Sequence, residues 1–163
     1  MSKQAQGLSV AAPVSAPRNK SKTLATWIAV AAGCLGAHRF YLHGRRDAWA
    51  WLHPWPTLLG AVGVLRMRAL GQDDHLAWVL IPMLGLMLSI AMLAAIVIGL
   101  TPDEVWADRF NPGQPARRSG WPAVIGVILA LMLGGTMLMG TIAFSGQKYF
   151  EYQAEPDIQA RPG

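Results

Sequence analysis

The chain of 163 residues contains a single cysteine and few charged side chains. One cysteine excludes an internal disulfide and leaves the redox compartment undetermined. Charged residues make up 14% of the sequence, whereas soluble domains contain about 25%. At the same time 53% of the residues are hydrophobic, which is more than the core of a small soluble domain requires. We therefore expect an integral membrane protein.

The sequence also lacks the residue groupings that catalysis and metal binding need. Its carboxylates lie in polar segments, Cys34 has no base close to it in the sequence, and no Gly-rich phosphate loop with a lysine is present. The four histidines show no metal-ligand spacing. We expect a protein that is not an enzyme and that has no metal and no cofactor.

The net charge of +5 raises the question of nucleic-acid binding. The 14 basic residues are scattered among the polar segments and form no stripe interleaved with aromatic residues. We therefore predict no nucleic-acid partner. The basic residues are better interpreted as a topology signal and as a source of affinity for lipid headgroups.

Two long stretches carry no charge at all. Residues 76–100 form a run of 25 residues, and residues 121–144 form a run of 24. Each is long enough to cross a hydrocarbon core of about 30 Å as a helix. These two stretches are predicted to be transmembrane helices.

Two shorter apolar stretches precede them. Residues 24–37 would give a helix of about 21 Å, which crosses only if the basic residues at its two ends reach the headgroups. Residues 49–65 are interrupted by His53-Pro54-Trp55-Pro56, which is expected to break any helix. This stretch either crosses the membrane or forms a re-entrant or interfacial element.

The predicted fold class is therefore an all-α membrane protein, a bundle of about four membrane segments with a short N-terminal hairpin and two long transmembrane helices. Residues 1–19 are expected to be a disordered cytoplasmic tail, 20–70 the hairpin, 71–152 the two long helices with a short loop helix, and 153–163 a flexible tail. As an alternative, the basic N-terminus and residues 24–37 form a signal peptide that is cleaved near Cys34.

Small residues recur four apart in three of these stretches, and such ladders allow helices to approach closely. We predict that the last two ladders pack against each other. The predicted packing residues are Ala25, Ala29 and Gly33; Ala91, Ala95 and Gly99; and Gly126, Ala130 and Gly134.

A short helix is predicted between the two long stretches. Thr101-Pro102-Asp103-Glu104 has a threonine cap, a proline at the first position and acids in the first turn. The helix is expected to end at Phe110 and to place Val105, Trp106 and Phe110 in the membrane interface.

The stretch from Gly33 to Leu42 joins the first apolar run to a polar and aromatic cluster, Ala37-His38-Arg39-Phe40-Tyr41-Leu42. Together with Lys20-Ser21-Lys22 before it, Gly44 after it and the later pair Gly60 and Gly63, this stretch resembles the TM-two domain family of small membrane proteins. The resemblance covers roughly residues 20–70. It implies two transmembrane helices with a short linker and no established catalytic activity. Leu65-Arg66-Met67-Arg68 departs from the family pattern, in which aromatic and then acidic residues follow the second glycine pair.

The motif residues His38, Arg39, Phe40 and Tyr41 are the candidate contact with a lipid or a partner. The two basic residues are predicted to lie at the C-terminal end of the first helix, where the helix dipole favours cations. The two aromatic residues suit the headgroup level. Arg39 either caps this helix and fixes its depth, or binds a lipid phosphate or a partner's carboxylate.

The distribution of basic residues predicts the topology. Four crossings with the N-terminus inside place eight basic residues inside and six outside, whereas three crossings that omit residues 49–65 give seven and seven. We predict a multi-pass protein of the bacterial inner membrane with both termini in the cytoplasm.

The predicted function is that of a non-enzymatic helix-packing or interaction module whose partner is a second copy or another membrane protein. The alternative is a small transporter or ion-conducting protein, which needs polar groups at membrane depth. The long stretches offer only Ser89, Thr136 and Thr141, whose hydroxyls are usually satisfied by their own helix.

Overall fold

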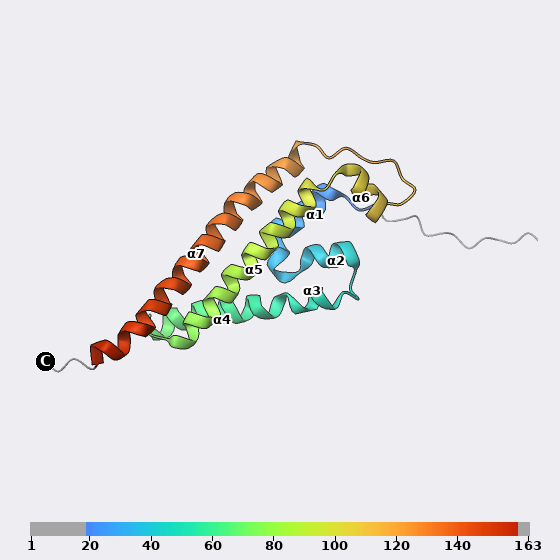
Figure 1. The fold of residues 1–163 in the computed structure, drawn as a ribbon. Helices are drawn as coiled ribbons and strands as arrows, with labels where there is room; N and C mark the ends of the chain where they lie inside the picture. Colours follow the sequence, from blue (N-terminus) through green and yellow to red (C-terminus); the bar gives the residue numbers. More distant parts are fainter. Residues whose placement is uncertain (1–18, 160–163) are drawn as a thin grey trace, which may run out of the picture.

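The computed structural model describes residues 19–159, with their side chains as far as residue 154. The tail predicted for residues 1–19 lies outside the described residues, except for its last position. All regular secondary structure in the described part of the chain is helical (Figure 1). The elements are α1 (Lys22–Ala32), the 3-10 turn η1 (Gly33–Leu35), α2 (Ala37–His43), α3 (Ala48–Leu52), α4 (Pro54–Leu70), α5 (His75–Leu100), α6 (Asp103–Phe110) and α7 (Trp121–Gln159).

The two long predicted helices are present as α5 and α7, which run antiparallel to each other (Figure 1). Both are long and apolar enough to cross a membrane, and only 28% and 17% of the residues in their most apolar stretches are buried within the chain. α7 begins at Trp121, as predicted, but continues to Gln159, so the helix extends into the segment expected to be a flexible tail.

The first apolar run does not form one helix. α1 ends at Ala32, η1 follows, and Gly36 adopts the left-handed conformation with φ of 78° before α2 begins. This turn sends α2 back toward the start of α1. The hydroxyl oxygen of Tyr41 accepts a hydrogen bond from the Ser21 backbone N–H at 2.8 Å, and the Lys20 ammonium donates to the Leu42 carbonyl. α1, η1 and α2 therefore form a helical hairpin.

This hairpin covers less than half of the length of α5. Its start is fixed at the C-terminal end of α5, because Lys22 Nζ donates to the Thr101 carbonyl at 2.8 Å. Its tip lies beside Ala91, whose Cβ is 2.8 Å from where a Cβ on Gly33 would lie. Thr101 lies ten positions after Ala91, a rise of about 15 Å, whereas the 26 residues of α5 extend about 39 Å. The first apolar run therefore does not extend along the full length of α5, and the structure gives no support to its crossing beside the long helices.

The second short stretch is more helical than predicted. The expected break at the prolines is confined to His53, and α4 begins immediately after it. Pro54 and Pro56 fall in the first turn of α4, where backbone N–H groups have no partner within the helix, so a missing donor costs little. α3 and α4 together span residues 48–70 with one interruption.

α4 packs antiparallel to the N-terminal half of α5. A Cβ on Gly60 would lie 2.5 Å from Leu84 Cβ, and one on Gly63 would lie 2.6 Å from Leu80 Cβ. Such short distances mean that the two backbones approach as closely as glycine allows. α5 thus contacts the hairpin over its C-terminal half and α4 over its N-terminal half.

The ends of the helices contradict the predicted four-crossing arrangement. That arrangement puts residues 20–22 and the 101–120 loop on opposite sides, yet the Lys20 backbone N–H donates to Asn111 Oδ1 at 2.8 Å. The start of α1, α6 and the start of α7 lie at one end of the molecule, and α7 ends at the other (Figure 1). The start of α1 and the end of α7 lie at opposite ends of the long helices, so this fold gives no support to the prediction that both termini are cytoplasmic.

The small-residue ladders lie in helix contacts, but their pairing differs from the prediction. Ala25, Ala29, Ala95 and Ala130 are fully buried, and a Cβ on Gly134 would lie 2.7 Å from Met92 Cβ. These residues belong to the contacts among α1, α5 and α7.

Thr26 of α1 explains why the last two ladders do not pair along their whole length. This side chain is fully buried, and it lies 3.4 Å from a Cβ built on Gly99 and 3.0 Å from one built on Gly126. α1 therefore packs against both α5 and α7 near the end of α5, where a Cβ built on Gly99 would also meet Val127 of α7, while Ala91 faces Gly33 of the hairpin.

Candidate functional site

The motif residues lie on the returning arm of the hairpin. His38 and Arg39 occupy the first turn of α2 rather than the C-terminal end of the first helix, because Gly36 ends the preceding turn. Arg39 Nε donates to Asp47 Oδ2 at 2.9 Å. Arg39 thus binds a carboxylate of its own chain and does not cap α1.

Asp47 connects this arginine to the next helix. Its other carboxylate oxygen accepts a hydrogen bond from the Trp49 backbone N–H at 3.0 Å, which caps the start of α3. The hydrogen bond from Arg39 is the main reason that the pKa of Asp47 lies below its usual value. The ion pair therefore fixes the angle at which α3 leaves the hairpin.

The remaining motif side chains are also engaged within the chain. Phe40 packs edge to face against Trp51, with ring centroids 5.2 Å apart. His38 is buried with 5% of its surface exposed, and its Nδ1 has no hydrogen-bond partner among the described residues. Its ring lies 6.0 Å from that of His53 at the tip of the hairpin. The motif mainly holds the hairpin against α3.

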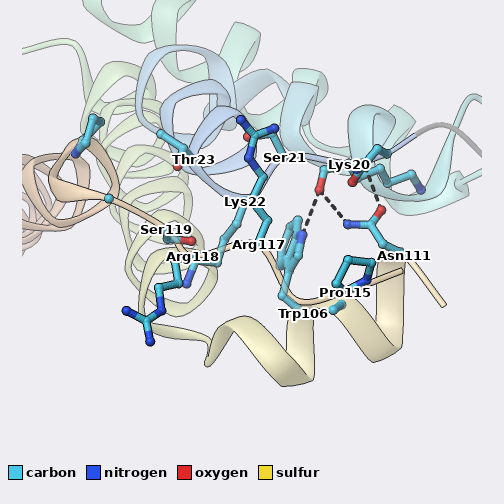
Figure 2. A pocket seen from close by; sticks show the side chains of 14 residues that line it. Lys20, Ser21, Lys22, Thr23, Trp106, Asn111, Pro115, Arg117, Arg118 and Ser119 are labelled. Carbon is cyan, nitrogen blue, oxygen red and sulfur yellow. Dashed lines mark hydrogen bonds between the residues drawn. The ribbon is translucent and has the colours of Figure 1, made fainter. Parts of the chain in front are cut away.

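A second polar cluster lies where the start of α1 meets α6 (Figure 2). The Asn111 side chain satisfies both backbone groups of Lys20, accepting from its N–H at 2.8 Å and donating to its carbonyl at 3.1 Å. Trp106 Nε1 donates to the same carbonyl at 2.9 Å. Trp106 is 5% exposed, so it packs into the protein, unlike the interfacial position predicted for it.

Asp103 joins three segments of this cluster. Its carboxylate pairs with Lys22 Nζ at 2.5 Å and accepts hydrogen bonds from the Ser119 hydroxyl at 2.6 Å and backbone N–H at 2.8 Å. Burial alone would raise the pKa of Asp103, but the hydrogen bonds from Lys22 and Ser119 outweigh it and lower the pKa to about 2. The carboxylate therefore stays ionised and ties the 111–120 loop to α1.

The predicted start of α6 is one residue early. The Thr101 hydroxyl donates to the Val97 carbonyl at 2.7 Å, so it completes α5 and does not cap α6. Pro102 takes the cap position, and Asp103 and Glu104 occupy the first turn. The helix itself ends at Phe110, as predicted.

The polar cluster encloses a cavity of about 380 Å³ (Figure 2). Every ionisable residue that lines it is basic: Lys20 and Lys22 from the start of α1, and Arg117 and Arg118 from the loop before α7. Lys22 is neutralised by Asp103. Both arginines are exposed, and neither guanidinium has a hydrogen-bond or ion-pair partner within the described part of the chain.

The cavity can receive an anion, because two guanidinium groups without a described partner line it and no carboxylate does. Sequence reasoning missed this site. Two basic pairs some 95 positions apart carry no signal that they meet, and only the folded loop brings them together. Within residues 19–154, no group of three His, Cys, Asp or Glu side chains could hold a metal ion.

Comparisons with known proteins give no relatives. No protein-family model matches the chain, and no curated protein or solved structure matches it. The resemblance to the TM-two domain family therefore has no support beyond the motif residues themselves.

Proposed function

We propose that this chain is a non-enzymatic integral membrane protein that serves as a helix-packing module for a second copy of itself or another membrane protein. In this proposal α3–α4, α5 and α7 cross the bilayer, and α1–α2 is a re-entrant hairpin. The observation that carries the proposal is the apolar surface of α5 and α7, most of which the chain itself leaves uncovered.

The outer side of α7 offers a surface for such packing. Met132, Met139 and Ile142 expose 69%, 67% and 58% of their surface, and they follow the spacing of one helix face. Gly135 lies between them, and a Cβ built there would meet nothing within 4 Å. A small residue flanked by flexible methionines allows another helix to approach closely.

The hydroxyls of the long helices favour packing over conduction. Ser89 donates to the Gly85 carbonyl, Thr136 to Met132 and Thr141 to Met137, each within its own helix. A hydroxyl that is occupied by its own backbone offers little to a passing ion or solute.

The charge distribution supports one orientation of this fold. Among the described residues, eight basic side chains belong to the end that holds the start of α1, and three belong to the other end. The first group is Lys20, Lys22, Arg39, Arg45, Arg46, Arg109, Arg117 and Arg118, and the second is Arg66, Arg68 and Lys148. Because basic residues concentrate on the cytoplasmic side, the start of α1 is proposed to face the cytoplasm and the end of α7 the opposite side.

Native electrophoresis of mildly solubilised membranes tests the packing function. The wild-type chain is expected to migrate above its monomer mass, and Gly135→Leu, which fills the outer face of α7, is expected to reduce that assembly. The control variant is Val79→Ala, which changes an exposed position of α5 and is expected to leave the assembly unchanged. Leu131→Ala would not serve as a control, because Leu131 is itself exposed on α7. A wild-type chain that migrates as a monomer would contradict the proposal.

One observation favours the second candidate, an ion-conducting role. The unpartnered Nδ1 of buried His38 lies beside His53 at the tip of the hairpin, part of the way along α5. An ion-conducting protein would carry protons across the membrane of proteoliposomes, and His38→Ala would reduce this proton flux. Flux equal to that of empty vesicles excludes this candidate.

A further inference from the structure

The basic cavity between the start of α1 and the start of α7 has no role in helix packing. Its walls come from the two helix starts, from α6 and from the 111–120 loop (Figure 2). None of its basic residues lies on the outer face of α7. An explanation for the cavity therefore goes beyond helix packing, and a lipid ligand rests on the membrane placement of the proposed function.

The charges of the cavity are only partly compensated. Asp103 neutralises Lys22, but Lys20 bonds a carbonyl, which leaves its charge in place, and the two arginines have no partner among the described residues. The Lys20 ammonium also lies over the Phe110 ring, away from the cavity lining, so the two exposed guanidinium groups are the cations that favour an anion here. Arginine pairs are well suited to phosphate because their planar donors match its oxygens.

The surroundings of the cavity indicate that the anion comes with an apolar tail. Leu24, next to the cavity residue Thr23, is 50% exposed, and Val124, just inside α7, is 47% exposed. Trp27 Nε1 donates to the Pro122 carbonyl at 3.1 Å, and tryptophan is enriched at the headgroup level of membranes. Cationic walls thus adjoin an apolar surface, and the proposed membrane placement puts this boundary at the level of lipid phosphates.

The loop that carries the two arginines is held in place. Ser119 is bound through both its backbone N–H and its hydroxyl to Asp103, directly after Arg118. Asn111 fixes the other end of the loop to Lys20. The arginines are therefore presented on a constrained segment, which lowers the entropy cost of binding.

We propose that this cavity binds the phosphate headgroup of an anionic phospholipid, with Arg117 and Arg118 as the ligands. The acyl chains lie against the exposed apolar side chains at the starts of α1 and α7. Its volume of about 380 Å³ falls within the range of small-molecule sites.

The test is native mass spectrometry of the full chain in a neutral detergent with added phosphatidylglycerol. The double variant Arg117→Gln/Arg118→Gln is compared with Arg45→Gln/Arg46→Gln, which removes the same charge at the same end of the molecule but outside the cavity. The cavity variant is expected to bind phosphatidylglycerol about tenfold more weakly than wild type, and the control variant to bind within about twofold of wild type. Phosphatidylcholine, which has no net charge, is expected to bind weakly to all three.

Three outcomes would overturn the proposal. Equal losses in the two variants would mean that general electrostatic attraction explains the binding. Unchanged binding in the cavity variant would mean that the lipid binds elsewhere. Inorganic phosphate that binds to the cavity while phosphatidylglycerol fails to displace it would assign the site to a free anion.

Thermal unfolding of both variants checks that they fold. Since the arginines of the cavity have no described partner, both variants are expected to unfold near the wild-type temperature. The assembly state does not enter this test, so failure here is distinct from failure of the packing function.

Discussion

At the scale of single residues, Gly36 has the largest effect on the path of the chain. Its φ of 78° places it in the left-handed region, and a Cβ on it would lie 2.6 Å from the Ala50 carbonyl oxygen. The residue therefore both reverses the chain and lets α3 approach the hairpin. Only glycine meets both requirements.

We expect Gly36→Ala to destabilise the protein by about 2 kcal/mol or more, from the left-handed backbone and the contact with α3. Gly113→Ala is the matched control, because Gly113 also has a positive φ of 82° but a methyl group there would meet nothing within 4 Å. The control should cost about 1 kcal/mol, from the backbone alone. Thermal unfolding in detergent measures both, and equal losses would show that the contact with Ala50 is unimportant.

Asp103 predicts a dependence of stability on pH. Because its pKa is lowered to about 2 in the folded protein, the stability it contributes is present above the unfolded value of 3.8 and is lost as the pH falls toward 2. The unfolding temperature of the wild type is expected to fall more steeply between pH 4 and pH 2 than that of Asp103→Asn. Parallel pH profiles would contradict this assignment.

At the scale of elements, the sequence located the long helices well and the short ones poorly. Uncharged runs of 24 and 25 residues can form little else than long apolar helices, and α5 and α7 begin where such runs begin. The structure of residues 24–37 was ambiguous from the sequence, because a short apolar run fits either a short membrane-crossing helix or one arm of a helical hairpin. The hairpin forms because Gly36 reverses the chain, and the sequence does not reveal the backbone angles of this glycine.

The pairing of α5 and α7 makes a prediction at the same scale. A Cβ on Gly134 would lie 2.7 Å from Met92 Cβ, so Gly134→Leu would force a side chain against Met92. We expect this variant to destabilise the protein by about 1–3 kcal/mol. Gly135→Leu is adjacent on the same helix but faces open space, so it should leave the unfolding temperature nearly unchanged. The two variants are compared by thermal unfolding of the monomeric fraction, and a larger loss for Gly135→Leu would mean that α7 is rotated relative to this structure.

At the scale of the whole molecule, the contact between Lys20 and Asn111 places the start of α1 and the 101–120 loop at the same end. Once the start of α1 and the 101–120 loop share an end, the basic residues within the described part of the chain separate into eight and three, whereas four crossings would divide the same residues into five and six. The two counts of charges from the sequence were nearly even because both treated residues 24–37 as a crossing. In the proposed topology these residues belong to a re-entrant hairpin, and the charge difference becomes large.

Reporter fusions test this topology. Alkaline-phosphatase and fluorescent-protein fusions after residues 43 and 112 are expected to report the cytoplasm, and those after residues 72 and 155 the opposite side. The physical reason is the concentration of basic residues at the end that holds residues 43 and 112. A fusion after residue 112 on the opposite side from one after residue 43 would contradict the fold.

The sequence by itself determined that the chain is helical and apolar, where its two long helices lie and where the loop helix α6 ends. These features depend on local hydrophobicity and on the length needed to satisfy the backbone of a helix. Tertiary structure alone decided that α1 turns back at Gly36, that Thr26 contacts both of the last two ladders and that two distant basic pairs line one cavity. Each of these depends on which residues meet across long separations in the chain, and no local pattern records such a meeting.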